Sequence, residues 1–233
     1  MSRVDQFGLP VGEPVADWAP RPLPPRAALP GRYCTVEPLH RDHGPSLFAA
    51  YSEDAGAMWT YMGYGPFPED GAFQAWLDEQ ASSEDPRFHA ITVGGEALGL
   101  AAYLRVQPEV GVIEIGHISL APRLRRTTAA TEGIALLMRR AFDELGYRRL
   151  EWKADALNAA SAAAAVRLGF TYEGTFRKAT IYKGRNRDTA WYAIVDDDWP
   201  LIRSGLDSWL DPANFDEQGR QIRPLAAAGG APL

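Results

Sequence analysis

The chain has 233 residues, of which 46% are hydrophobic and 23% are charged. This composition is typical of a soluble protein with one well-buried domain, or with one domain and appendages. The net charge of -6 argues against a dedicated nucleic-acid binder, because such a domain normally carries an excess of Lys and Arg.

Individual residues argue against further classes of protein. The single cysteine, Cys34, cannot form an intramolecular disulfide or a cysteine-based metal site. His40 and His43 form the one close histidine pair and lack partner ligands, so we expect no metal. No apolar run approaches the ~18 residues of a membrane span, and the N-terminus lacks the apolar core of a signal peptide. We therefore expect no membrane partner and a cytoplasmic location.

The first 30 residues differ in composition from the rest of the chain. Residues 1–30 hold seven prolines and two glycines without hydrophobic periodicity, which indicates a disordered arm or an extended strap on the domain surface. Trp18 favours the strap, because a large aromatic side chain gains most when it is buried. We expect a single domain over residues 31–210 and a polar, Ala- and Gly-rich tail that frays over residues 211–233.

The spacing of apolar residues separates helices from strands within this domain. Gly94 and Gly95 form a hairpin signal, and Gly146 is placed to end a helix. The order of elements predicts an α/β (α+β) fold in which helices cover a mixed sheet. The expected strands are residues 31–39, 87–93, 97–106, 110–120, 147–154, 171–183 and 189–195, with a turn at 184–188, and the expected helices are residues 41–52, a helix from 68, 128–145, 159–168 and 197–210.

Two motifs in the second half of the domain carry chemistry. Arg123, Arg125 and Arg126 precede small and hydroxyl-bearing residues that enter an amphipathic helix. Such a loop suits a diphosphate, because free backbone N–H groups and the helix dipole both favour anions at a helix N-terminus. Further along, Asn158-x-x-Ser161 shortly precedes Leu-Gly-Phe and Glu-Gly.

With these motifs the chain resembles the GNAT acyltransferases (Gcn5-related N-acetyltransferases), and within them the RimJ/RimL-like branch, over residues 31–199. The resemblance implies a mixed, mostly antiparallel central sheet of about seven strands flanked by helices. It also implies direct transfer of an acetyl group from acetyl-CoA to a primary amine, without a metal. The acceptor would be a peptide or protein N-terminus, a small amine or an aminoacyl conjugate. The protein would be a monomer or a homodimer, and nucleic acid is an unlikely partner.

The resemblance places the cofactor on two elements. Backbone N–H groups of Ile118, Ser119 and Leu120 would polarise the thioester carbonyl, and Asn158 would flank the pantetheine arm. Arg126 and Thr128 stand where the family has loop glycines, and side chains are sterically acceptable there if φ is negative. The diphosphate would lie on the N–H groups of Arg125, Arg126, Thr127, Thr128, Ala129 and Ala130.

The departing thiolate needs a proton donor. Ala165 stands where many GNAT enzymes carry a tyrosine for this step, so Ser161 becomes the candidate. A serine hydroxyl is a poor acid, so Ser161 would act as a relay or position the sulfur. The alternative is that Ser161 only lines the helix start beside Asn158, and Asp155 is expected to cap the same segment.

The attacking amine needs a base. Glu114 is the first candidate, because a charged residue in a mostly apolar strand is costly to bury without a partner; the alternative is a salt bridge. Strand alternation places His117, the second candidate, on the opposite face. RimL-like enzymes can carry a glutamate near the place of Thr180, so a water chain is also possible.

One aromatic segment, one basic segment and the overall function each allow two interpretations. Trp59, Tyr61 and Tyr64 could wall an acceptor pocket or belong to the core. The basic run at residues 182–188 favours a hairpin turn, with charges that are solvated or paired with Asp188, over a nucleic-acid site. The changed loop and the missing tyrosine also allow a non-catalytic acyl-CoA-binding sensor or partner protein.

Overall fold

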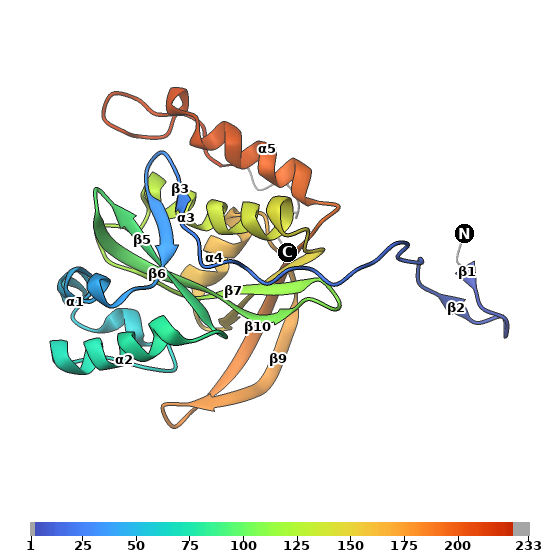
Figure 1. Ribbon diagram of the computed structural model, residues 1–233, viewed down its shortest axis with the longest axis horizontal. Coiled ribbons are helices and arrows are strands. Elements are labelled where there is room, and N and C mark those ends of the chain that lie inside the picture. Colours follow the sequence, from blue (N-terminus) through green and yellow to red (C-terminus); the bar gives the residue numbers. More distant parts are fainter. Residues whose placement is uncertain (1–2, 226–233) are drawn as a thin grey trace.

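One large sheet forms the centre of the protein (Figure 1). The structure is a computed structural model that describes residues 3–225. In spatial order, the sheet consists of β3 (Leu29–Pro30), β4 (Thr35–Pro38), β5 (Arg87–Val93), β6 (Glu96–Gln107), β7 (Val112–Leu120), β8 (Arg149–Asp155), β10 (Arg185–Val195) and β9 (Thr171–Tyr182). Every neighbouring pair is antiparallel except β7 and β8, which are parallel. The predicted mixed, mostly antiparallel sheet is confirmed, with β3 as an additional short strand.

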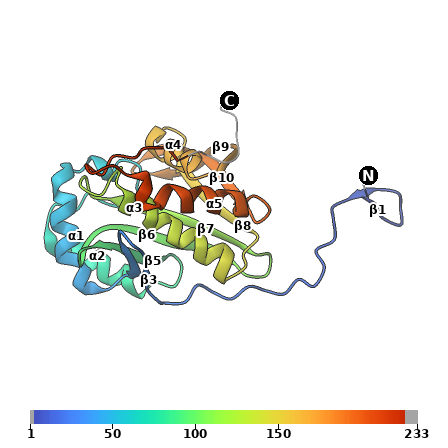
Figure 2. The ribbon, with the colours of Figure 1, turned by 90° about the horizontal axis from the view of Figure 1, so that it is seen from above.

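Helices cover both faces of this sheet (Figures 1 and 2). They are α1 (Gly44–Tyr51), α2 (Asp70–Ser82), α3 (Thr128–Arg139), α4 (Ala159–Arg167) and α5 (Trp199–Leu210). On one face, Phe88 of β5 packs against Trp76 of α2 with ring centroids 5.9 Å apart. On the other face, the Tyr103 hydroxyl of β6 donates to Leu137 O of α3 at 2.5 Å. Within residues 3–225, no helix is long and apolar enough to cross a membrane.

Two predicted elements differ in the structure, because their hydrogen bonding departs from what the periodicity indicates. The strand expected at residues 31–39 is confined to β4, because the N–H groups of residues 32–34 donate to a carboxylate on α3. The helix expected at residues 128–145 is α3 followed by one π-helical turn, Arg140–Glu144. Gly146, with φ of 70°, follows that turn, as expected of a glycine at a helix end.

The N-terminal segment has two parts. Residues 18–28 lie along the domain as a strap, and residues 3–17 extend away from it (Figures 1 and 2). In the extended part, β1 (Arg3–Val4) pairs with β2 (Pro10–Val11). The strap is held by donations from Trp18 Nε1 to Glu109 O (2.7 Å), from Tyr147 Oη to Pro22 O (3.1 Å) and from Arg140 Nη1 to Ala27 O (2.7 Å).

The segment after α5 lies against that helix. Asn214 is 1% exposed, and its Nδ2 donates to Trp209 O and to Arg223 O, both at 3.1 Å. The part of the predicted tail up to residue 225 is therefore tied to α5 instead of fraying. Residues 226–233 of that tail lie outside the described residues.

Candidate active site

The two parallel strands at the centre of the sheet separate part-way along their length. Residues 112–114 of β7 pair with residues 149–151 of β8. Beyond these residues the two strands continue but do not pair with each other. The edge of β7 that faces β8 therefore has no strand neighbour beyond this short ladder. At the end of the strand, Leu120 O accepts a hydrogen bond from Arg125 Nε at 2.9 Å. Ile118, Ser119 and Leu120, the strand residues predicted to bind the cofactor, lie in this last part of β7.

Tyr51 of α1 holds the end of β7. Its hydroxyl lies 2.9 Å from Ser119 Oγ and 3.1 Å from Ser119 O. Burial raises the pKa of Tyr51, so the phenol stays protonated at neutral pH and can donate. The hydroxyl and the carbonyl oxygen of Ser119 are thus both in contact with Tyr51 of α1, so neither is free for a ligand.

The loop before α3 presents three free backbone donors. The N–H groups of Arg126, Thr128 and Ala129 have no acceptor among residues 3–225. Together with the dipole of a twelve-residue helix, they form a site suited to an anion. The other predicted donors are used inside the loop, from Arg125 N to Ala121 O (3.2 Å), from Thr127 N to Leu124 O (3.3 Å) and from Ala130 N to the N-cap Thr127 Oγ1 (3.1 Å).

The three loop arginines differ in their partners. Arg123 pairs with Glu53 at 3.0 Å and also with Glu96. Arg125 pairs with the buried carboxylate of Asp54. Arg126 alone of the three has no carboxylate partner within the described chain. Its φ of 62° also differs from the negative φ expected of a loop without glycine; this left-handed conformation costs a non-glycine residue about 1 kcal/mol.

Asn158 and Ser161 are brought together at the start of α4. Asn158 caps the helix, since its Oδ1 accepts from Ser161 N at 3.1 Å. Ser161 Oγ lies 2.9 Å from the indole Nε1 of Trp152 on β8. An indole nitrogen can only donate, so the Ser161 hydroxyl accepts this bond and keeps its own proton free. Asp155 caps the preceding turn, with its Oδ1 accepting from Leu157 N at 2.8 Å.

Glu114 of β7 is 3% exposed and lies in a charge network. The network is on the face of the sheet opposite to Trp152 and Ser161. Its Oε2 contacts Arg105 Nη1 at 2.7 Å and Lys153 Nζ at 2.9 Å. Lys153 also pairs with Glu151 at 2.8 Å and lies 3.8 Å from the centre of the Trp191 ring. This arrangement corresponds to the salt-bridge alternative considered for Glu114. A proton taken up by Glu114 would weaken both of its ion pairs.

His117 lies on the same face as Glu114, and the expectation of opposite faces is wrong. Gly116 pairs with Ala102 and Ser119 pairs with Leu100, so three steps along β7 match two along β6. This β-bulge, with φ of 50° at His117, interrupts the alternation of side chains. The His117 ring therefore packs beside Phe88, with ring centroids 5.1 Å apart, on the face covered by α1 and α2.

The His117 imidazole is neutral at physiological pH. Burial lowers the pKa of His117 to about 4, and the positive charges of Arg105 and Arg187 act in the same direction. Its Nδ1 lies 3.2 Å from the Tyr64 hydroxyl, and the two rings stack with centroids 5.6 Å apart. A neutral imidazole held in this way can accept a proton.

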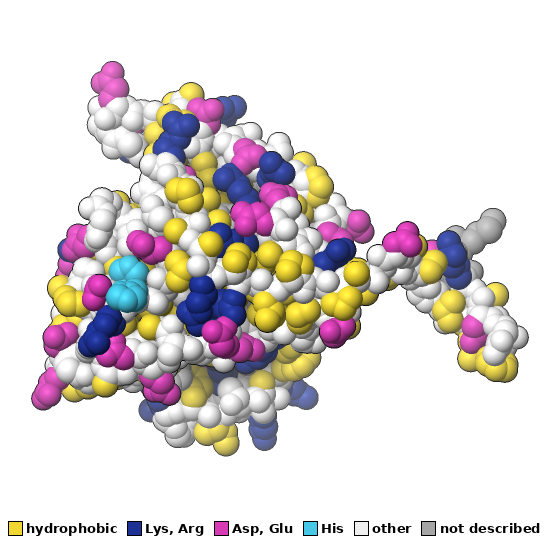
Figure 3. Space-filling model, in the orientation of Figure 1, with side chains coloured by type: hydrophobic (Ala, Val, Ile, Leu, Met, Phe, Trp, Pro, Cys, Tyr) yellow, Lys and Arg dark blue, Asp and Glu magenta, His cyan; other side chains and the backbone are white. Residues whose placement is uncertain are grey.

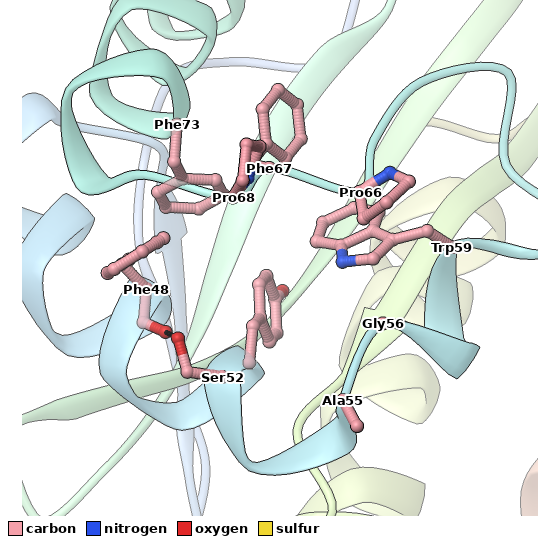
Figure 4. Close-up of a pocket in the computed structure, with 10 residues that line it drawn as sticks. Phe48, Ser52, Ala55, Gly56, Trp59, Pro66, Phe67, Pro68 and Phe73 are labelled. Atoms are coloured by element: carbon pink, nitrogen blue, oxygen red, sulfur yellow. Dashed lines mark hydrogen bonds between the residues drawn. The ribbon is translucent and has the colours of Figure 1, made fainter.

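The aromatic loop between α1 and α2 takes part in both the core and the site. Trp59 is 4% exposed and lines a pocket of about 250 Å³, shown in Figure 4. Tyr64 packs between Trp76 and His117, whereas Tyr61 donates its hydroxyl to Leu157 O at 3.1 Å. The pocket has an apolar lining without a charged side chain, made of Phe48, Tyr51, Ser52, Ala55, Gly56, Trp59, Pro66, Phe67, Pro68 and Phe73.

A mixed, mostly antiparallel sheet flanked by helices is the arrangement implied by the resemblance. Residues 34–171 match the family profile described as the acetyltransferase (GNAT) domain. The chain therefore belongs to the GNAT acetyltransferases. No curated protein sequence matches the chain at a significant level.

Solved structures give more specific likenesses. A GCN5-related N-acetyltransferase from Brucella melitensis is 44% identical over 91% of this chain and 97% of its own, with a TM-score of 0.89. A probable acetyltransferase (GNAT family) from Chromobacterium violaceum ATCC 12472 is 40% identical over 82% of this chain and 98% of its own, with a TM-score of 0.77. RimL, a ribosomal L7/L12 alpha-N-protein acetyltransferase, is 19% identical over 75% of this chain and 99% of its own, with a TM-score of 0.63. The likeness to RimL is one of fold alone.

Proposed function

We propose that this GNAT protein is an acetyl-CoA-dependent N-acetyltransferase that transfers an acetyl group directly to a primary amine. The observation that carries the proposal is where the candidate proton-transfer groups lie, next to the point at which β7 and β8 separate. Trp152 and Lys153 are consecutive on β8 and so point to opposite faces. Trp152 binds Ser161, whereas Lys153 binds Glu114. The candidate proton donor and the candidate bases thus lie on opposite faces, with the edge of β7 that β8 leaves unpaired between them.

Acetyl-CoA, the acetyl donor, is expected on the side of the separating strands that carries α3 and α4. The free N–H groups of Arg126, Thr128 and Ala129 would hold its diphosphate, and Asn158 would flank its pantetheine arm. Bound acetyl-CoA would supply the thioester carbonyl that the amine attacks. Backbone N–H groups at residues 118–120 would then stabilise the developing negative charge on the carbonyl oxygen.

Ser161 is proposed to deliver the proton to the departing sulfur. Trp152 fixes the hydroxyl as an acceptor, so its hydrogen is left to point elsewhere. Ala165 is fully buried in α4 and has no group that could do this.

His117 is proposed to take the proton from the attacking nitrogen. That proton becomes more acidic as the nitrogen–carbon bond forms, so a neutral imidazole of low pKa suffices. Glu114, the other candidate, is proposed to hold Arg105 and Lys153 beside the reacting groups. The experiment that separates the two candidates is given in the Discussion.

The acceptor is proposed to be a peptide or protein N-terminus or a small amine, in line with a RimJ/RimL-like role. A second function is supported by the buried Ala165: a non-catalytic acyl-CoA-binding sensor. Release of free CoA, measured with a panel of peptides and amines, separates the two. A sensor binds acetyl-CoA but shows no amine-dependent release, whereas the proposed enzyme shows release that saturates with one class of acceptor.

Arg126→Glu is expected to weaken acetyl-CoA binding more than tenfold, on the order of 1.4 kcal/mol, in a calorimetric titration. The reason is that the loop cation without a carboxylate partner becomes an anion beside the diphosphate. Arg177→Glu, an exposed arginine of β9 without a carboxylate partner in residues 3–225, changes the net charge equally and is the control. Unchanged affinity in Arg126→Glu, or an equal loss in Arg177→Glu, would contradict the assignment.

Ser161→Ala is expected to lower kcat about tenfold or more, while acetyl-CoA affinity stays nearly unchanged. Steady-state kinetics and a binding titration on the same preparation measure the two effects. Because the substitution also leaves the Trp152 N–H unpaired, Trp152→Phe serves as the control that removes the same hydrogen bond and keeps the hydroxyl. Full turnover in Ser161→Ala would remove the proposed role.

A further inference from the structure

The hairpin formed by β9 and β10 carries a group of basic side chains without carboxylate partners in the described residues. Its two-residue turn consists of Lys183 and Gly184, both with positive φ. The turn predicted at residues 184–188 is therefore too long, because β10 already begins at Arg185. In Figure 3 dark blue side chains gather at the lower end of the molecule, where Figure 1 places this hairpin. Within residues 3–225, no carboxylate lies within 4.0 Å of the charged groups of Arg177, Lys178, Lys183, Arg185 and Arg187.

Two hydrogen bonds join this hairpin to loops near the face of the sheet that carries His117 and Glu114, where the acceptor amine is expected. Lys183 Nζ donates to Trp59 O at 2.6 Å, which joins the hairpin turn to the aromatic loop. The Tyr182 hydroxyl donates to Asp155 Oδ2 at 2.7 Å, which joins it to the end of β8. The basic side chains are thus held close to the face of the sheet where His117 and Glu114 lie.

Arg187 differs from the other four cations in burial. Arg177, Lys178, Lys183 and Arg185 are exposed, whereas Arg187 is half-buried. Its Nε is fully shielded from solvent and has no hydrogen-bond partner. A buried guanidinium donor without an acceptor is unfavourable unless a ligand provides one. The positive charge of Arg187 also acts on His117, which indicates that the two groups are close.

We propose that Arg187 binds a carboxylate of the acceptor, so that the preferred acceptors carry a carboxylate close to the reacting amine. This inference rests on the proposed function. The guanidinium offers two N–H groups in a fork that matches the two oxygens of a carboxylate. The four exposed cations would attract the same negatively charged acceptor from a distance, on a chain whose net charge is -6. Acidic peptides and free amino acids both offer this chemistry.

The test compares acceptors in matched pairs at about 150 mM salt, where long-range attraction is screened. One arm uses a peptide with Asp next to its N-terminal residue against the same peptide with Asn. The other uses an amino acid against its amide. For the wild type, at least one pair should show kcat/KM at least about tenfold higher for the carboxylate. Arg187→Gln should reduce that ratio to near one, and Arg187→Lys should leave an intermediate ratio. Arg185→Gln, the same charge change two residues away, should keep it.

A ratio near one in both arms for the wild type, or an unchanged ratio in Arg187→Gln, would overturn the inference. Calorimetric binding of each peptide pair and each amino-acid pair, with CoA present, gives a readout that needs no turnover. Arg187-dependent binding of a carboxylate without any turnover would support the inference and reject the proposed function. Turnover that is equal for acceptors with and without the carboxylate would support the proposed function and reject the inference. Tighter binding of an RNA oligonucleotide, weakened equally by Arg185→Gln and Arg187→Gln, would replace a carboxylate site with a nucleic-acid site.

Discussion

Glu132→Ala is expected to lower the free energy of unfolding by about 3–5 kcal/mol. Glu132 lies on α3 and is 5% exposed. Its carboxylate accepts from the backbone N–H groups of Arg32, Tyr33 and Cys34 at 2.8, 2.6 and 2.9 Å. Removal of the side chain would leave these three donors without an acceptor in a region that is largely shielded from water. Urea unfolding, analysed at constant slope, measures the loss.

Two further variants decide whether these hydrogen bonds are the cause. Glu132→Gln keeps the shape but offers one oxygen instead of two, so it should lose about half as much stability. Glu217→Ala removes an exposed glutamate and should change stability by less than about 0.5 kcal/mol. A Glu132→Ala protein within about 1 kcal/mol of the wild type would show that water replaces the carboxylate.

His117→Gln is expected to lower kcat by about 10²–10⁴-fold, the range for loss of a general base. Burial lowers the pKa of His117 to about 4, so the imidazole is in its base form across neutral pH. With both substrates saturating, kcat of the wild type should therefore hold at mildly acidic pH and fall as the pH approaches 4, because the imidazole becomes protonated. The pH dependence of kcat measures this limb.

Tyr64→Phe is the matched control, because it removes the hydroxyl 3.2 Å from His117 Nδ1 and keeps the ring. It should cost far less activity than His117→Gln. Glu114→Gln tests the other candidate, and it should leave the acidic limb in place. If His117→Gln stays active while Glu114→Gln abolishes the acidic limb, the base is Glu114 and His117 only packs beside it.

Much of the fold followed from local patterns. The hairpin at Gly94 and Gly95 and the helix N-terminus after the arginine loop depend on residues close together in sequence, and the structure has both. The N-cap of α4 is Asn158, whereas Asp155 was expected to cap this segment. The strand at residues 31–39 was predicted too long, because Glu132 takes up the N–H groups of residues 32–34. A carboxylate about 100 residues away leaves no local signal.

The candidate site was only partly predictable for the same reason. Gly116 within the strand is compatible with a bulge but does not fix which residue is the extra one, and the bulge at His117 moves the imidazole to the face of Glu114. The bond from Trp152 to Ser161 joins a strand to a helix that packs on it. Arg187 was treated as a solvated turn charge, whereas it lies within β10 and its Nε is buried. A basic residue two positions before a buried strand was the one signal available for it.

The sequence by itself determined the class of protein and the position of the loop proposed to bind an anion, because both depend on motifs whose residues are neighbours along the chain. Only the tertiary structure decided which groups within those motifs are free to act. It pairs Arg123 and Arg125 with carboxylates and leaves Arg126 open, it surrounds Glu114 with two cations, and it buries His117. Charges and hydrogen bonds depend on distance in space, and the packing of strands and helices sets that distance across tens of residues.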